Sequence, residues 1–285
     1  MTVLADRSAE SHRLTSAQRV LSILGAFDAE NLALSLSEIS RRSGLTLSTT
    51  HRLLNELCCW GALTRHSDGT YGIGLRILEL GTLAPQGGRL REIALPYLHD
   101  LQHALRANIH LGVPDGHAVI HVESLRARDT VPVPSRQGGR WPLHATGTGL
   151  VLLAYAPQEF QDEVLARELR GYTAKTLTDP DELRRFLAEV RRTGVAVVES
   201  QLTYGVTAVA VPIRGPRDKV VAALGITVPS GSASPHALVP AMTTTARSIS
   251  RALGAPSAGA PAPRPHGRVR EATRPRTPPG AGPAS

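Results

Sequence analysis

Residues 36–54 read LSEISRRSGLTLSTTHRLL, and this stretch decides the fold of the N-terminal part of the chain. Its pattern predicts a short helix that Ser35 or Ser37 caps and that Gly44 ends, because glycine tolerates the left-handed backbone of a tight turn. A second helix follows the turn, and apolar or small side chains recur on one of its faces at Thr50, Leu53, Leu54 and Leu57. Two helices in this arrangement form a helix-turn-helix, whose second helix can enter the major groove of DNA.

Elements on both sides of this motif complete a small domain. Residues 17–27 carry apolar side chains at helical spacing. Downstream, residues 62–65 and 70–73 flank an Asp-Gly turn at Asp68-Gly69, which is typical of a β-hairpin. We therefore expect a winged helix-turn-helix domain over residues 14–75, followed by a linker helix over residues 76–88.

The outer face of the second predicted helix is polar. Its hydroxyls and N-terminal N–H groups suit phosphate oxygens, and Arg52 and Asn55 can read the edges of guanine and adenine. Neighbouring arginines are candidates for contacts with the DNA backbone. The candidate DNA-binding residues are Arg41, Arg42, Thr46, Ser48, Thr49, His51, Arg52, Asn55 and Arg65. Two alternatives stay open: the helical head binds a protein instead, or His51 forms only a local hydrogen bond with the backbone.

The charge of the chain does not by itself identify this segment. The formal net charge is +8, but residues 1–80 hold eight arginines, no lysine and eight acidic residues, so this segment is neutral. Residues 254–285 hold five arginines and one glutamate and are rich in Pro, Ala and Gly, so we expect a disordered tail there. The prediction of DNA binding therefore depends on the local pattern.

The composition favours a reduced, cytoplasmic compartment. No stretch approaches the roughly 20 apolar residues that span a bilayer, and charges near the N-terminus argue against a signal peptide. Cys58 and Cys59 are adjacent, which makes a poor disulfide pair and leaves too few thiols for a zinc site.

The second half of the chain alternates predicted strands and helices. Residues 108–113 and 117–123 flank a Pro-Asp-Gly turn, and further strands are expected at 131–133, 195–200, 206–213 and 220–228. Helices are expected at 90–107, 144–155, 159–169, 180–193 and 237–253. Hairpins with flanking helices indicate an α+β domain on a mainly antiparallel sheet, over residues 89–253.

These patterns resemble one known family. Residues 16–81 are similar to the N-terminal domain of the IclR family of bacterial transcriptional regulators, most specifically through the string Ser48-Thr49-x-His51-Arg52-Leu53-Leu54. Leu47 and Thr50 depart from the polar and aliphatic residues that the family usually has there. Downstream, the resemblance reaches about Ser230 through Arg140-x-Pro142-Leu143-His144-Ala145-Thr146-Gly147-x-Gly149, Thr178-Asp179-Pro180 and Gly205-Val206-x-x-Val209-Ala210.

The resemblance implies a GAF-like second domain, in which an antiparallel sheet cups a small organic ligand, often a carboxylate. N–H groups at the start of the helix near Gly147 would hold that carboxylate, and the flat face of Trp141 favours an aromatic ligand. Carried over onto this sequence, the effector-binding residues are Val133, Trp141, Gly147, Thr148, Val198, Glu199, Val206, Ala208, Gly225 and Thr227.

Two departures from the family pattern concern this pocket. Glu199 stands one position after the family's usual acid, so either the cup lacks an acid or the register differs by one, because adjacent strand residues face opposite sides. Leu150 replaces the family's usual lysine. Plainer interpretations also stay open: the glycines near Gly147 serve close packing, Glu199 is a solvated charge, and Trp141 fills the core.

Catalytic and metal-binding functions are disfavoured. The sequence contains no Cys-x-x-Cys spacing, no Gly-x-Ser-x-Gly elbow and no phosphate-binding glycine loop. His110 and His121 can meet across the predicted hairpin, but no third metal ligand is predictable, so we expect no metal and no cofactor.

We therefore expect a transcriptional regulator controlled by a small molecule. Because a palindromic operator in double-stranded DNA needs two reading heads, the expected form is a homodimer or a dimer of dimers. The alternatives are a GAF-like sensor whose helical head binds a protein and, with less support, an enzyme.

Overall fold

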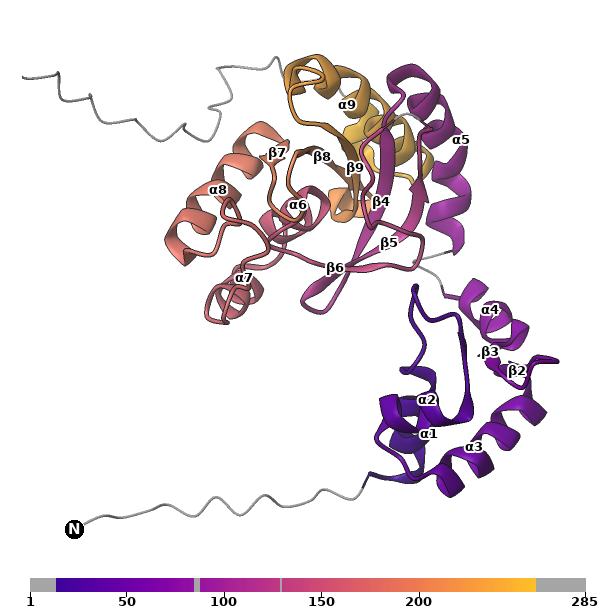
Figure 1. The fold of residues 1–285 in the computed structure, drawn as a ribbon. Coiled ribbons are helices and arrows are strands. Elements are labelled where there is room, and N and C mark those ends of the chain that lie inside the picture. The colour runs from indigo at the N-terminus through magenta and orange to yellow at the C-terminus, as the bar shows by residue number, and fades with distance from the viewer. Residues whose placement is uncertain (1–13, 85–87, 129, 260–285) are drawn as a thin grey trace, which may run out of the picture. The chain divides into compact units, whose positions relative to one another are not determined.

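The computed structural model describes residues 14–84, 88–128 and 130–259 (Figure 1). The chain divides into two compact units, residues 1–85 and residues 86–285. Each unit has its own buried apolar core.

The first unit combines four helices with a small sheet. Its strands follow the order β1-β3-β2 and pair antiparallel. Its core contains the fully or almost fully buried side chains of Ile23, Leu34, Ile39, Leu54 and Tyr71. The elements are α1 (Ser16–Leu24), β1 (Ala33–Leu34), α2 (Leu36–Ser43), α3 (Leu47–Trp60), β2 (Leu63–Arg65), β3 (Tyr71–Ile73) and α4 (Leu75–Thr82).

Local hydrogen bonds set the ends of the first unit's helices. The N–H of Glu38 donates to the Ser35 hydroxyl over 3.3 Å, and the N–H of Ser35 donates to the Glu38 carboxylate over 2.8 Å, which forms a capping box for α2. Gly44 ends α2 with a φ of 70°, and Thr46 caps α3 through the N–H of Thr49. The predicted helix-turn-helix and its hairpin are confirmed. The third strand, β1, was not predicted because its two residues show no periodicity.

The second unit is built on a six-stranded antiparallel sheet with the order β6-β5-β4-β9-β8-β7. The strands are β4 (Asn108–Asp115), β5 (Ala118–Leu125), β6 (Arg140–Pro142), β7 (Ala196–Glu199), β8 (Val206–Arg214) and β9 (Val220–Pro229). The helices are α5 (Gly88–Leu105), α6 (Gly147–Ala154), α7 (Gln158–Leu165), α8 (Pro180–Thr193) and α9 (Pro235–Ala252).

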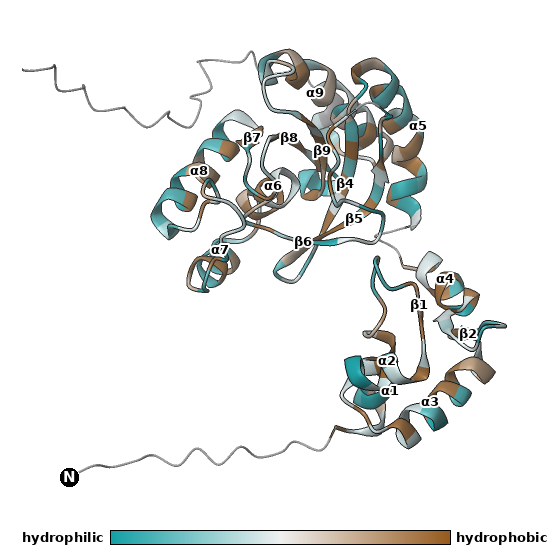
Figure 2. Cartoon of the chain, in the orientation of Figure 1, coloured by the Kyte–Doolittle hydropathy of each residue, from teal (hydrophilic) through white to brown (hydrophobic). Residues whose placement is uncertain are grey.

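Helices cover both faces of this sheet. α5 and α9 pack on one face and bury the apolar side chains of β4, β8 and β9 that point toward them, whereas α6 and α8 close a second core on the other face. Figure 2 shows the hydrophobic residues concentrated along these strands, with hydrophilic residues on the outer sides of the helices. The predicted α+β domain on an antiparallel sheet is confirmed. Among the described residues, no helix is both long enough and apolar enough to cross a membrane.

Several boundaries differ from the prediction. The strand predicted at 131–133 is absent from the described sheet, whose edge strand is instead β6. The helix predicted from 144 begins at Gly147, because the Thr146 side chain accepts a hydrogen bond from the N–H of Gly149 and caps α6.

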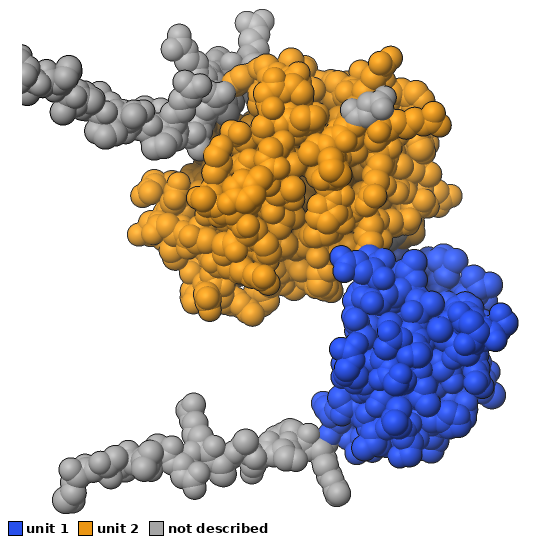
Figure 3. All heavy atoms as spheres, viewed as in Figure 1, with its two compact units in different colours: residues 1–85 blue, residues 86–285 orange. Residues whose placement is uncertain are grey.

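The segment joining the two units and the C-terminal segment are described only in part (Figure 3). Residues 85–87 of the predicted linker lie outside the described residues, and the described linker helix is α4. At the other end, the N–H and hydroxyl of Ser257 donate to the Asp218 carboxylate, and Ala255 is buried. The folded unit therefore continues past the boundary predicted at 254, to the short 3₁₀ helix Pro256–Gly259. The predicted disordered tail lies outside the described residues from 260 onward.

Gly149→Ala should destabilise the second unit, because an added Cβ would lie 2.5 Å from the carbonyl oxygen of Leu143 and 2.6 Å from its Cα. Leu143 is buried and cannot move aside freely. We expect the free energy of unfolding in urea to fall by about 1–3 kcal/mol. Gly171→Ala is the matched control, since its Cβ would meet nothing closer than Thr178 Cγ2 at 3.8 Å. An equal loss in both variants would contradict this contact.

Candidate nucleic-acid interface and ligand pocket

α3 has one buried face and one exposed polar face. Thr50, Leu53, Leu54 and Leu57 are buried in the core of the first unit, as the pattern predicts. The candidate DNA-binding residues on the opposite face are exposed, except for the half-buried Thr49; they are Thr46, Ser48, Thr49, His51, Arg52 and Asn55. The Thr50 hydroxyl donates to the carbonyl oxygen of Thr46 over 2.9 Å, so this departure from the family pattern is satisfied inside the core.

Arg52 is paired along the helix. Its Nη1 lies 2.6 Å from Oε1 of Glu56, one turn further on, and both side chains are more than half exposed. An exposed pair of this kind contributes only about 0.3–0.5 kcal/mol to stability. A DNA contact could therefore replace the pairing of Arg52 with Glu56, because losing this pair lowers the stability of the helix only slightly.

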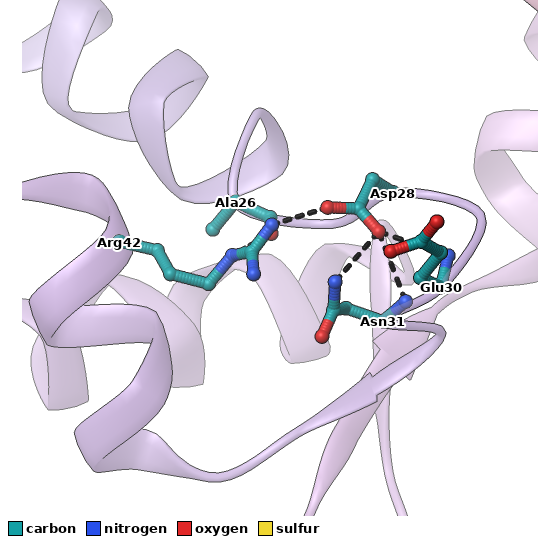
Figure 4. Close-up of polar contacts among 5 residues, drawn as sticks. All are labelled: Ala26, Asp28, Glu30, Asn31 and Arg42. Carbon is teal, nitrogen blue, oxygen red and sulfur yellow. Dashed lines mark hydrogen bonds and ion pairs between the residues drawn. The ribbon is translucent and has the colours of Figure 1, made fainter.

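Arg42 is held inside its own domain (Figure 4). Its Nε donates to the carbonyl oxygen of Ala26 over 2.7 Å, and its Nη2 pairs with the Asp28 carboxylate. The same carboxylate accepts hydrogen bonds from the N–H of Glu30 and from the backbone and side chain of Asn31. Arg42 thus connects α2 to the loop after α1. Arg41 and Arg42 are both exposed, but these contacts occupy Nε and Nη2 of Arg42, so its predicted contact with the DNA backbone would have to use Nη1 or break them.

The hairpin of β2 and β3, which forms the wing of the domain, carries Arg65, the last of the candidate DNA-binding residues. β2 and β3 pair antiparallel, and the Asp68 carboxylate closes their turn by accepting from the N–H of Thr70 over 2.9 Å. Gly69 adopts a φ of 84°, which suits glycine. Arg65 lies at the end of β2 with its guanidinium carbon 5.8 Å from the centre of the Tyr71 ring. Arg65 is exposed and therefore accessible to a phosphate.

The second unit contains a pocket between the sheet and the start of α6. Nine of the ten effector-binding residues carried over from the family resemblance line it: Val133, Trp141, Gly147, Thr148, Val198, Val206, Ala208, Gly225 and Thr227. Glu199 is the exception. It is an exposed residue at the end of β7, and its carboxylate lies 3.3 Å from Nζ of Lys175. Val198 faces the pocket and Glu199 faces away, because neighbouring residues of a strand alternate. Glu199 is thus a solvated charge, and no acid stands among the described lining residues.

Glycines allow α6 to approach the sheet closely. A Cβ on Gly225 would lie 2.6 Å from Cγ2 of Thr148, and a Cβ on Gly147 would lie 3.4 Å from the side chains of Ala208 and Ala210. Close packing is therefore a real role of these glycines. It also brings the first N–H groups of α6, which have no acceptor within a helix, to the pocket wall.

The polar side chains of the described pocket lining are hydroxyls, the amide of Gln201 and two histidines. His110 and His121 come from the neighbouring strands β4 and β5, and their rings are stacked with centroids 5.0 Å apart. Burial lowers the pKa of His121 to about 4. Burial, followed by the charges of His121 and Arg126, lowers the pKa of His110 well below its usual 6.5. Among the described residues, the lining contains no Asp, Glu, Lys or Arg.

Sequence reasoning missed part of this lining. It weighed His110 and His121 only as metal ligands, although both stand at inward positions of a predicted hairpin. It also missed Ser135 and the segment 201–203, which come from connections without periodicity. Within the described residues, no three His, Cys, Asp or Glu side chains are grouped to hold a metal ion.

Two families of protein domains match the chain. The IclR helix-turn-helix domain matches residues 16–67, and the family described as bacterial transcriptional regulator IclR C-terminal matches residues 85–251. A helix-turn-helix domain followed by a pocket-bearing sheet domain defines a class of DNA-binding regulators. The chain belongs to the IclR family of bacterial transcriptional regulators.

Individual relatives match over nearly their whole length. The HTH-type transcriptional regulator XynR of Escherichia coli K12 is 29% identical over 86% of this chain and 99% of its own. The glycerol operon regulatory protein of Streptomyces coelicolor is 31% identical over 86% of this chain and 98% of its own. The crystal structure of an IclR homolog from Microbacterium hydrocarbonoxydans, complexed with 4-hydroxybenzoate, superposes with a TM-score of 0.80 at 34% identity, covering 84% of this chain and 99% of that one.

Arg42→Ala and Asp28→Asn should both lower the thermal midpoint of the first unit, because each breaks the contact between α2 and the loop. Arg41→Ala should leave the midpoint unchanged and reduce the salt dependence of DNA binding by about one phosphate contact. If Arg42 contacts phosphate instead, Arg42→Ala will change the salt dependence as Arg41→Ala does, while Asp28→Asn will not.

The contact between Asp28 and Arg42 should also make stability depend on pH. Hydrogen bonds from Asn31 and Glu30, and then Arg42, lower the pKa of Asp28. The stabilisation from the ionised carboxylate is therefore present above its ordinary pKa of 3.8 and is lost as the pH falls through the lowered pKa.

Proposed function

We propose that α3 of this regulator reads operator DNA and that an aromatic carboxylic acid, bound in the sheet domain, controls that binding. The observation that carries the effector class is the pocket itself: a tryptophan and apolar walls that meet the N-terminus of a helix. The alternative in which the helical head binds a protein is favoured by no observation. We further propose that the protein binds its effector without converting it, and that it acts in the cytoplasm, where operator DNA lies.

The pocket suits a flat acid. Trp141, Val133 and Val198 provide apolar surface for an aromatic ring. The N–H groups of Gly147 and Thr148, at the positive end of α6, suit a carboxylate. Because Glu199 points away, no acidic side chain of the described lining repels that group. The 4-hydroxybenzoate bound to the Microbacterium homolog is a ligand of this class.

The neutral charge of residues 1–80 supports action as an oligomer. One head with no excess of positive charge gains little from phosphate contacts. We propose that a homodimer, or a dimer of dimers, places two heads on a palindromic operator. An effector controls such a complex only if it binds the DNA-competent and DNA-incompetent arrangements with different affinities.

4-Hydroxybenzoate should raise the thermal midpoint of the full chain, because a ligand that binds only the folded state stabilises that state. At a ligand concentration one hundred times the Kd, the free energy of unfolding should rise by about 2.7 kcal/mol. Trp141→Ala should abolish most of this shift. Trp60→Ala is the matched control, since Trp60 is the chain's other tryptophan and lies in the first unit. A panel of benzoates that leaves the midpoint unmoved would disprove the effector class, and an equal loss in both variants would remove Trp141 from the site.

Arg52→Ala should weaken binding to the operator by about 5- to 150-fold, which corresponds to the loss of about 1–3 kcal/mol of base discrimination. Binding to random duplex should change far less. Glu56→Gln frees the same guanidinium and should preserve the preference for the operator. A gel-shift titration over DNA upstream of the gene, at several salt concentrations, measures both quantities. The proposed role of Arg52 fails if specific and non-specific binding weaken equally, and no preference over random duplex at any salt would refute operator recognition.

A further inference from the structure

The stacked histidines form part of the wall of the ligand pocket. His110 and His121 are only 3% and 5% exposed, yet both line the pocket. They lie on adjacent antiparallel strands, where Gly112, the pairing partner of His121, has no side chain to separate the rings. Two imidazoles are therefore buried at the wall of the ligand pocket, where they can respond to what binds there.

Every ring nitrogen of the pair contacts a hydroxyl. His110 Nδ1 lies 3.1 Å from Ser135 Oγ and 3.3 Å from Ser124 Oγ, and its Nε2 lies 3.2 Å from Thr227 Oγ1. His121 Nδ1 lies 2.7 Å from Ser135 Oγ, and its Nε2 lies 3.2 Å from Thr148 Oγ1. The hydroxyls of Thr148 and Thr227 belong to the pocket lining as well, so they connect the pair to a ligand.

Hydroxyl partners leave the protonation state of the pair open to change. A hydroxyl can rotate either to donate to a bare ring nitrogen or to accept from an N–H, whereas a carbonyl can only accept. An imidazole between two hydroxyls is therefore satisfied both as a neutral ring and as a cation. A single added proton leaves no buried donor without a partner, so the cost of an unpaired donor is not added to the cost of desolvating the charge.

Few charged groups face the pair. The elements and the connection packed against it contribute uncharged side chains among the described residues: Ser124, Ser135, Trp141, Thr148 and Thr227. Arg126 is the nearest cation, and its Nη2 donates to the carbonyl oxygen of Ser135 over 2.7 Å. Glu123, further along β5, is paired with Arg91 at 2.7 Å. Burial lowers the pKa of both histidines, so the empty pocket is uncharged near neutral pH.

We propose that the His110–His121 pair takes up one proton from the solvent when an aromatic carboxylate binds, so that the anion and its counter-charge enter the pocket together. The inference rests on the effector class proposed above. A carboxylate in a pocket without an ionised side chain favours the cationic form of a neighbouring imidazole. Because the two rings are stacked, like-charge repulsion prevents a second proton from binding. The buffer acid loses the proton that the pair gains.

Titration calorimetry of the full chain with 4-hydroxybenzoate tests this proposal. In two buffers of different ionisation heat at the same pH, the difference in binding heat gives the number of protons taken up. We expect about one proton per ligand near pH 7, and an affinity that falls about tenfold for each pH unit between about pH 6 and pH 8. The uncharged analogue 4-hydroxybenzamide, which needs no counter-charge, should bind with no proton uptake and no pH dependence.

Variants of the two histidines test whether the proton binds to this pair. His110→Asn with His121→Asn keeps polar side chains that do not titrate, so it should bind the amide and lose both the proton uptake and the pH dependence for the acid. His99→Asn changes an exposed histidine on α5 and should behave as the unchanged protein. If that double variant does not fold, His110→Gln with His121→Gln, which also removes both titratable rings, takes its place.

The outcomes separate the two proposals. Binding of the acid with no proton uptake would overturn the role of the histidine pair while leaving the effector class intact, since the N–H groups at the start of α6 would then suffice for the anion. Proton uptake that persists in the histidine variants would overturn it also. Failure of both the acid and the amide to bind would instead remove the proposed effector class, and this inference with it.

Discussion

The contact on which the second unit depends is the approach of α6 to the sheet. Gly225 leaves room for Thr148, and Gly147 lies against Ala208 and Ala210, so that every residue of α6 is buried. A helix that started a few ångströms further from the sheet would leave its first N–H groups in solvent. Close packing and ligand binding are therefore not competing explanations of these glycines, because the packing brings the helix terminus to the pocket.

The same approach determines the character of the pocket. Apolar side chains and Trp141 form most of its wall, and its polar side chains among the described residues are hydroxyls, Gln201 and the two stacked histidines. The acid that the family resemblance placed nearby is directed outward to Lys175. Under the proposals above, an anionic ligand would meet helix N–H groups and proton acceptors instead of a fixed cation, which would couple recognition to protonation. In the DNA-binding domain, Arg42 braces α2 against the loop after α1. The exposed polar face of α3 is the surface proposed for DNA recognition.

Much of the fold was predictable because local patterns carry it. The Gly44 turn, the capping residues and the Asp68-Gly69 hairpin each specify backbone geometry within a few residues. The prediction failed where pairing partners are distant. β1 is two residues long and exists because β3 pairs with it, and β6 is a strand because β5 lies beside it, whereas Val131 and Val133 have strand-like composition but no place in the described sheet.

By itself, the sequence determined the two kinds of domain, the buried and exposed faces of α3, and nine of the ten residues carried over to the pocket from the family resemblance. These follow from periodicity, capping and matching strings, all of which are local or copied position by position. Only the tertiary structure decided that Glu199 faces solvent, that Arg42 is engaged with Asp28, and that His110 and His121 stack within one network of hydroxyls. Strand register and contacts across many residues of chain set these features, and no local pattern encodes which side chains they bring together.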